Sequence, residues 1–291
     1  MNPPRPHITG LSHVGLFVRD PHRSRAFYKH FLGFAEPCSM IDRDEQLQLA
    51  WIKINDHQTI ELFPEKAEHS DRLSHIALET DDLVALRRYL ESRDVPISDE
   101  AGKGRIGDSI LSVVDPDHHI VEFVQHDPDG WPAREIGRFM PDTRIAPRMS
   151  HAGILAGSLA RSLRFYCDIL GFRETWRGSR DGQKLSWVNV QVPDGNDYLE
   201  LMLYEQLPDA DKRHTPHHIC LEVPSVPQAE RLLRDRSLPE ECKPLTAVRV
   251  GINGKRQLNC YDPDGTRVEL MEPQTADGMP SAASSAPPPI A

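Results

Sequence analysis

The chain has 291 residues, which predicts two domains because a typical domain runs to roughly 100–200 residues. Its 38% hydrophobic and 27% charged residues exclude a collagen-like or wholly disordered protein. The formal net charge of −10, without a basic stripe, argues against nucleic acid as a partner. Because it has no long apolar run and no signal-peptide pattern at its start, we expect a cytoplasmic protein with no membrane partner.

An internal repeat organises the chain. The segment LSHVGLFVRDPHRSRAFYKHFLGF predicts a strand and then a helix that begins after Asp20 and stops at Gly33. The segment MSHAGILAGSLARSLRFYCDILGF repeats this pattern, with Ser158 as the cap and Gly171 as the stop. Shorter echoes cover residues 72–95 and 216–238. Each copy precedes short runs of alternating or β-branched residues, so we predict four modules of one strand, one helix and three strands.

The connectors indicate how these modules group. We predict one domain at residues 8–126 for modules one and two, a linker at 127–148, and a second domain at 149–273 for modules three and four. The Pro, Ala and Ser-rich tail at 274–291 is expected to be disordered. Short connectors within each pair favour this tandem arrangement. Pairing module one with four and two with three is the alternative.

Each module carries one histidine on its first strand and one glutamate on its last strand, 47 to 51 positions later. Strand alternation places His13 on the same face as Gly15, opposite the apolar Val14 and Leu16. A lone strand histidine is more often a hydrogen-bonded residue than a ligand, but the pattern recurs in all four modules. Two imidazoles and one or two carboxylates suit a divalent transition metal such as Fe, Mn, Ni, Co or Zn. The candidate ligands are His13, Glu61, His75, Glu122, His151, Glu200, His218 and Glu269.

These features resemble the vicinal oxygen chelate (VOC) superfamily, which includes glyoxalase I enzymes, extradiol dioxygenases and bleomycin resistance proteins. The resemblance rests on the βαβββ module, the string F-Y-x-x-x-L-G-F at residues 27–34, its cousin at 165–172, and the terminal E-L or E-F strands. It covers residues 8–273. It implies an α+β fold in which four βαβββ modules form two glyoxalase-like eight-stranded cups. Each cup would hold four of the candidate ligands, from modules one and two and from modules three and four.

The resemblance implies three possible functions. The stretch from His13 to Phe34 is similar to the first glyoxalase I signature, although the glycines expected before His75 are missing. The turn at residues 262–265 with Glu269 is similar to that of extradiol dioxygenases, whose active-site tyrosine would fall at Asn259. A bleomycin-resistance-like protein that sequesters a ligand is the third alternative, but such proteins typically lose the metal ligands.

We therefore expect a metal-dependent enzyme acting on a small-molecule substrate with vicinal oxygens, and favour glyoxalase-like isomerase or lyase chemistry. The expected catalytic residues are Glu200 or Glu61, as ligand or base, and Tyr261. The oligomeric state is open, with a homodimer as one option. The C-terminal half keeps Gly265 in its turn where the N-terminal half has His118, so we expect the C-terminal centre to contribute more activity.

Overall fold

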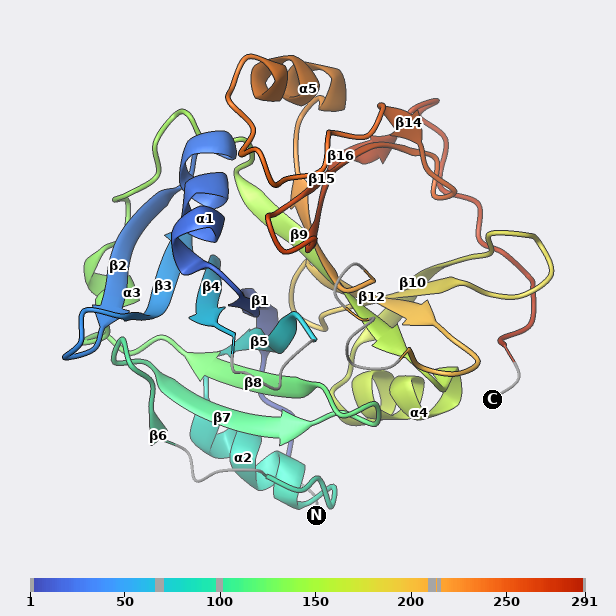
Figure 1. The fold of residues 1–291 in the computed structure, drawn as a ribbon. Coiled ribbons are helices and arrows are strands. Elements are labelled where there is room, and N and C mark those ends of the chain that lie inside the picture. Colours follow the sequence, from blue (N-terminus) through green and yellow to red (C-terminus); the bar gives the residue numbers. More distant parts are fainter. Residues whose placement is uncertain (1–2, 66–70, 98–101, 209–212, 214–215, 290–291) are drawn as a thin grey trace.

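A computed structural model describes residues 3–65, 71–97, 102–208, 213 and 216–289. These residues form two eight-stranded sheets, one in each half of the chain, which lie beside one another (Figure 1). The strand order is β2-β3-β4-β1-β5-β8-β7-β6 in the first sheet and β10-β11-β12-β9-β13-β16-β15-β14 in the second. The two orders are equivalent, as expected for a duplicated unit.

The strands of the first sheet are β1 (Ile8–Val18), β2 (Ala35–Ile41), β3 (Leu47–Lys53), β4 (Thr59–Pro64), β5 (Leu73–Thr80), β6 (Gly102–Lys103), β7 (Ser109–Val114) and β8 (Ile120–Gln125). Those of the second sheet are β9 (Arg148–Ala156), β10 (Arg173–Gly178), β11 (Trp187–Gln191), β12 (Tyr198–Leu203), β13 (His218–Glu222), β14 (Arg249–Val250), β15 (Lys255–Tyr261) and β16 (Arg267–Thr275). The helices are α1 (Pro21–Ala26), η1 (Phe27–Phe31), α2 (Leu83–Glu91), α3 (Trp131–Arg134), α4 (Leu159–Leu163), η2 (Arg164–Ile169) and α5 (Val226–Arg234).

Strand pairing joins neighbouring modules. The first strand of module one, β1, pairs in parallel with β4 and antiparallel with β5, the first strand of module two. In the second half, β9 pairs in the same way with β12 and β13. The predicted module order, the α+β class and the tandem pairing are therefore confirmed, and the mixed pairing is wrong.

The first helix of each half has the same construction. Asp20 caps α1 by accepting hydrogen bonds from two backbone amides, and the following turn η1 is π-helical. Gly33 and Gly171 end the two helical segments with φ values of 81° and 79°, which favour glycine. Ser158 occupies the N-cap position of α4, but its side chain makes no capping hydrogen bond, contrary to the sequence prediction.

Reciprocal hydrogen bonds link the two halves. Tyr28, from the F-Y string of the first half, donates its hydroxyl to Asp262 Oδ2 of the second half at 3.3 Å. Tyr166, from the matching string, donates to Asp115 Oδ2 of the first half at 2.9 Å. All four residues are buried. The F-Y string of each half thus contacts the Asp-Pro-Asp turn of the other half.

The C-terminal tail follows the second sheet. Trp176 of β10 donates its indole N–H to the carbonyl of Ala282 at 2.9 Å, and the amide of Leu185 donates to the carbonyl of Pro287 at 2.8 Å. Composition predicts disorder for 274–291 because the tail has little apolar surface to bury. Hydrogen bonds from the Trp176 indole and the Leu185 amide to carbonyls of the tail need no such surface. Residues 290 and 291 lie outside the described range. Among the described residues, no helix is long and apolar enough to cross a membrane.

Candidate metal centres

The sheet register brings the ligands of modules one and two together. Gly15 on β1 is paired with Glu61 on β4 and with His75 on β5. A side chain at Gly15 would collide with the His75 imidazole, so this second ring occupies the space that the glycine leaves beside His13. Gly153 makes the same room for His218 in the second half. Each centre therefore depends on a glycine between its strands.

The N-terminal centre combines two imidazoles with two carboxylates. The Nε2 atoms of His13 and His75 are 2.9 Å apart. Glu61 Oε2 lies 3.7 Å from His13 Nε2 and 3.6 Å from His75 Nε2, and Glu122 Oε1 lies 3.2 Å from His13 Nε2. All four predicted ligands of this half thus converge on one point. Two imidazoles and two carboxylates are ligands that Fe, Mn, Ni, Co and Zn accept.

Neighbouring side chains orient these ligands. Trp51 donates its indole N–H to Glu61 Oε1 at 2.6 Å, which leaves Oε2 facing the imidazoles. The Nδ1 atoms of His13 and His75 lie 3.3 Å and 3.2 Å from the hydroxyls of Ser12 and Ser74. A hydroxyl can accept a hydrogen bond from Nδ1–H, which leaves the Nε2 lone pairs free for a metal.

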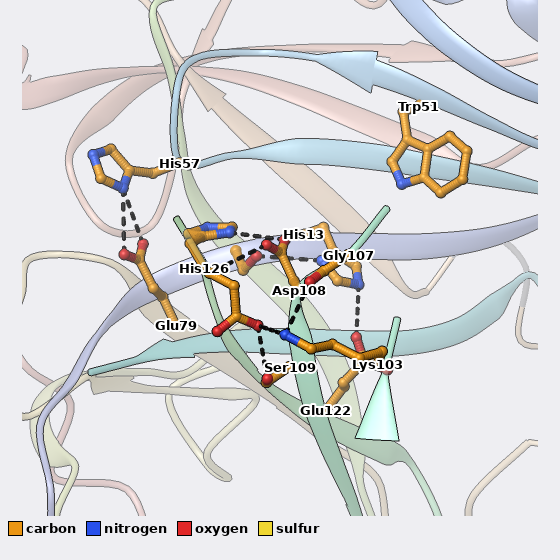
Figure 2. Close-up of polar contacts among 12 residues, drawn as sticks. His13, Trp51, His57, Glu79, Lys103, Gly107, Asp108, Ser109, Glu122 and His126 are labelled. Atoms are coloured by element: carbon orange, nitrogen blue, oxygen red, sulfur yellow. Dashed lines mark hydrogen bonds and ion pairs between the residues drawn. The ribbon is translucent and has the colours of Figure 1, made fainter. Parts of the chain in front are cut away.

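The N-terminal centre opens into a cavity of about 240 Å³. His13, Glu61, His75 and Glu122 all line it, and the His13 and His75 side chains are 9% and 11% exposed. Figure 2 shows His13, Glu122 and Trp51 at this cavity, with His126 and Asp108 close by. A small molecule in the cavity would therefore reach the ligand atoms. The apolar part of the wall includes Leu49, Phe63, Ile106, Ile110 and Val124.

The carboxylates give this centre a negative field. Burial lowers the pKa of His13, but Glu61 and Glu122 outweigh burial and raise it to about 9. Burial raises the pKa of Glu122, but the contact with His13 outweighs burial and lowers it. Burial and the neighbouring His13 lower the pKa of His75. The cluster thus attracts a positive charge, as a divalent cation site must.

The C-terminal centre repeats the ligand set. His151 Nε2 and His218 Nε2 are 3.1 Å apart. Glu200 Oε1 lies 3.6 Å from His218 Nε2, and Glu269 Oε2 lies 3.5 Å from His151 Nε2. All eight sequence-predicted ligands therefore fall into two clusters of four.

One arginine distinguishes the C-terminal centre. Arg267 Nη2 lies 2.6 Å from His218 Nδ1. A guanidinium group only donates, so this 2.6 Å contact favours the tautomer in which Nδ1 accepts and the proton of the neutral ring is on Nε2; the Pro216 carbonyl, the competing acceptor for an Nδ1 proton, is farther away at 3.3 Å. The Nε2 atom that faces Glu200 then has no lone pair for a metal. In the N-terminal half, the equivalent register position opposite the turn is held by the aliphatic Ile120.

Charge and burial separate the centres further. Burial, Arg267 and Lys255 hold the pKa of His151 well below its usual value, and burial and Arg267 do the same for His218. Burial and Glu269 raise the pKa of Glu200 to about 8. These directions indicate that the C-terminal centre favours a cation less than the N-terminal centre does. The side chains of His151 and His218 are 1% and 0% exposed, and neither lines the nearby cavity of about 370 Å³.

Several neighbours of the centres were not singled out from sequence. Cys220 forms a possible ligand group with His151 and Glu269, and the ring of Tyr198 stacks on His151 with centroids 4.5 Å apart. The predicted catalytic residue Tyr261 pairs with Arg267 across β15 and β16 and lines, with Trp187 and Arg267, a cavity adjacent to the one that Glu200 and Glu269 line. Trp51 and Arg267 were also not predicted from sequence, because only the folded sheet brings Trp51 to Glu61 and Arg267 to His218.

Comparison with known proteins agrees with this geometry. The family model described as Glyoxalase/Bleomycin resistance protein/Dioxygenase superfamily matches residues 10–123 and 148–270, one match for each sheet. The chain belongs to this superfamily. The uncharacterized protein YaeR of Escherichia coli (strain K12) is 29% identical over 132 residues, which are 43% of this superfamily member and 95% of YaeR.

Solved dioxygenases share the fold. The 2,3-dioxygenase LapB from Pseudomonas sp. KL28 superposes with a TM-score of 0.68 at 16% identity, over 96% of this chain and 98% of LapB. Homoprotocatechuate 2,3-dioxygenase from Arthrobacter globiformis has a TM-score of 0.68 at 17% identity, over 94% of this chain and 82% of its own. At these identities the likeness extends to the fold and not to the reaction.

Proposed function

We propose that this VOC protein is a metal-dependent enzyme that acts on a small substrate with two adjacent oxygen atoms, and that its reaction centre is the N-terminal one. The observation that carries the proposal is the convergence of His13, Glu61, His75 and Glu122 at an open cavity, with both Nδ1 atoms near hydroxyls. The C-terminal centre fits a metal less well, because Arg267 occupies the Nδ1 atom of His218.

The two carboxylates favour isomerase or lyase chemistry. When bound, a divalent metal would supply Lewis-acid polarisation of the substrate's adjacent oxygens. Glu61 is suited to take a proton from the carbon next to a carbonyl group, because Trp51 holds its Oε1 while Oε2 faces the centre. Glu61 Oε2 would then return the proton to the neighbouring atom. This reaction consumes no dioxygen.

The cavity wall supports a substrate with an oxygenated end and an apolar end. Leu49, Phe63 and Val124 offer apolar contacts beside the ligand atoms. Arg105 also lines the cavity, with its guanidinium 6.0 Å from the centre of the Phe63 ring. Arg105 is therefore available to bind an anionic group of the substrate. It would then be a substrate-binding residue rather than a solvated surface charge.

Ring cleavage is the second candidate. The fold likeness to 2,3-dioxygenases and the turn before Glu269 favour it. Against it, Asn259 occupies the position expected for the dioxygenase tyrosine, and Tyr261 lines a different cavity from Glu269. Sequestration without chemistry is the third candidate, and the complete ligand sets count against it.

Oxygen uptake separates the three candidates. The Fe-loaded and Ni-loaded proteins are offered a panel of α-hydroxycarbonyl adducts and, separately, a panel of catechols and hydroquinones. We expect turnover in the first panel without oxygen consumption. Stoichiometric oxygen uptake with a yellow ring-opened product would establish ring cleavage instead. Binding without turnover in either panel would favour sequestration.

A matched pair of variants identifies the base. Glu61→Gln keeps the size of the side chain and is expected to lower turnover by about 10²–10⁴-fold, the usual contribution of a general base. Glu91→Gln is the control, because Glu91 is exposed and, among the residues that the structure describes, its ion-pair partner is Arg87 on its own helix. Turnover by Glu61→Gln at the wild-type rate would exclude Glu61 as the base.

A further inference from the structure

A third group of metal-ligating side chains lies outside both centres. His57 follows β3, Glu79 lies on β5 and His126 follows β8. One ligand atom from each of the three lies within 4.8 Å of the others. None of the three belongs to the repeated histidine and glutamate pattern. All three lie at the same end of the first sheet. The parallel strands β5 and β8 end there, and the turn that leads into β4 lies beside them.

The contacts within this group leave room for an ion. His57 Nδ1 lies 3.1 Å and 3.3 Å from the two oxygens of Glu79. The rings of His57 and His126 are 6.4 Å apart between centroids. Ligand atoms around a tetrahedral Zn²⁺ at about 2.0–2.2 Å lie roughly 3.5 Å from one another, so small side-chain movements would complete the coordination.

His126 has the surroundings that are usual for a metal-binding histidine, with one ring nitrogen at a carboxylate and the other without a hydrogen-bond partner among the described residues. Its Nδ1 lies 2.9 Å from Oδ2 of the buried Asp108. Its Nε2 is buried and has no hydrogen-bond partner among the described residues. A carboxylate that accepts from one ring nitrogen fixes the tautomer and directs the lone pair of the other nitrogen outward. In Figure 2, His126 and Asp108 lie between the His57–Glu79 pair and His13.

We propose that His57, Glu79 and His126 form a third transition-metal site, suited to Zn²⁺, with Asp108 as the positioning residue of His126. Two imidazoles and one carboxylate with an open fourth position suit Zn²⁺. His57 lines both the cavity of the N-terminal centre and a separate groove of about 740 Å³. Glu79 lines this groove as well. The groove gives the ion a path from solvent that does not pass the N-terminal centre. The three ligands are different residues from those of the N-terminal centre, although His57 and His126 line the same cavity.

Zinc counting tests this site in the full-length protein. Metal-free wild type and the double variant His57→Ala/His126→Ala are titrated with Zn²⁺ against a chromophoric chelator. We expect the double variant to bind one Zn²⁺ fewer per chain, and Asp108→Asn to weaken that site by about 10–100-fold. The matched control is His7→Ala, since His7 also pairs with a carboxylate, Asp81, at 2.6 Å, but within the described part of the chain it belongs to no group of three ligands.

A complementary variant removes one histidine ligand from the N-terminal centre and one from the C-terminal centre. His13→Ala/His151→Ala should still bind one Co²⁺ with the visible absorption of a tetrahedral site, and adding Glu79→Gln should abolish that band. Circular dichroism establishes that each variant is folded. Equal Zn²⁺ stoichiometry and affinity in wild type and His57→Ala/His126→Ala would overturn the third site. Such a result would leave the proposed function untouched, because the central ligands are different residues.

Discussion

Replacing His75 with alanine is expected to lower metal affinity by at least about 100-fold and to abolish activity, because His75 is a direct ligand candidate in the open N-terminal centre. Replacing His218 is expected to leave both properties close to wild type, since Arg267 already occupies its Nδ1 atom. Metal content and turnover of the two purified variants measure the difference.

This expectation reverses the one from sequence. The presence of Gly265 where the N-terminal half has His118 favoured the C-terminal centre, on the assumption that the glycine matters to the turn. His118 adopts φ = 67° and Gly265 adopts φ = 88°, and both amides donate to the first aspartate of their turn. The turns are therefore equivalent. Larger losses in His218→Ala than in His75→Ala would restore the original expectation.

Replacing Arg267 with isoleucine is expected to create metal binding in the C-terminal half, with one additional ion per chain. The change introduces the residue type found at the equivalent Ile120. It frees Nδ1 of His218 to carry the ring proton, so that Nε2 presents its lone pair, and removes a positive charge from the centre. Metal analysis of the reconstituted variant checks the stoichiometry.

A second arginine provides the control for this variant. Arg256 lies on β15, and its guanidinium pairs with Glu272 at 3.4 Å rather than with a histidine. Arg256→Ile should bind the same number of ions as wild type. An unchanged metal content in a folded Arg267→Ile protein would mean that burial of His151 and His218, and not the arginine, prevents binding.

Much of the fold could be predicted because local patterns encode it. The period of two around His13, the helix stop at Gly33 and the Asp-Pro turns each depend on a few neighbouring residues. The short connectors within each pair of modules then favoured the tandem pairing that the two sheets show. The eight ligands followed from the same repeat, since each occupies one position in a strand whose faces alternate.

The remaining features depend on contacts between distant segments. Arg267 and Ile120 occupy the same position of the repeat, but the effect of Arg267 on His218 appears only once their two strands pair. The Tyr166–Asp115 contact joins residues 51 positions apart across the domain boundary. His57, Glu79 and His126 lie outside the repeat, so no spacing identified them. Such contacts give no periodic signal in the sequence.

Anomalous X-ray diffraction at the absorption edge of the bound metal tests most directly which half holds the reaction centre. Crystals of protein loaded with one equivalent of Fe²⁺ or Ni²⁺ are expected to give their strongest peak among His13, Glu61, His75 and Glu122. A strongest peak among His151, Glu200, His218 and Glu269, with the N-terminal cluster empty, would contradict the assignment of the reaction centre to the N-terminal half.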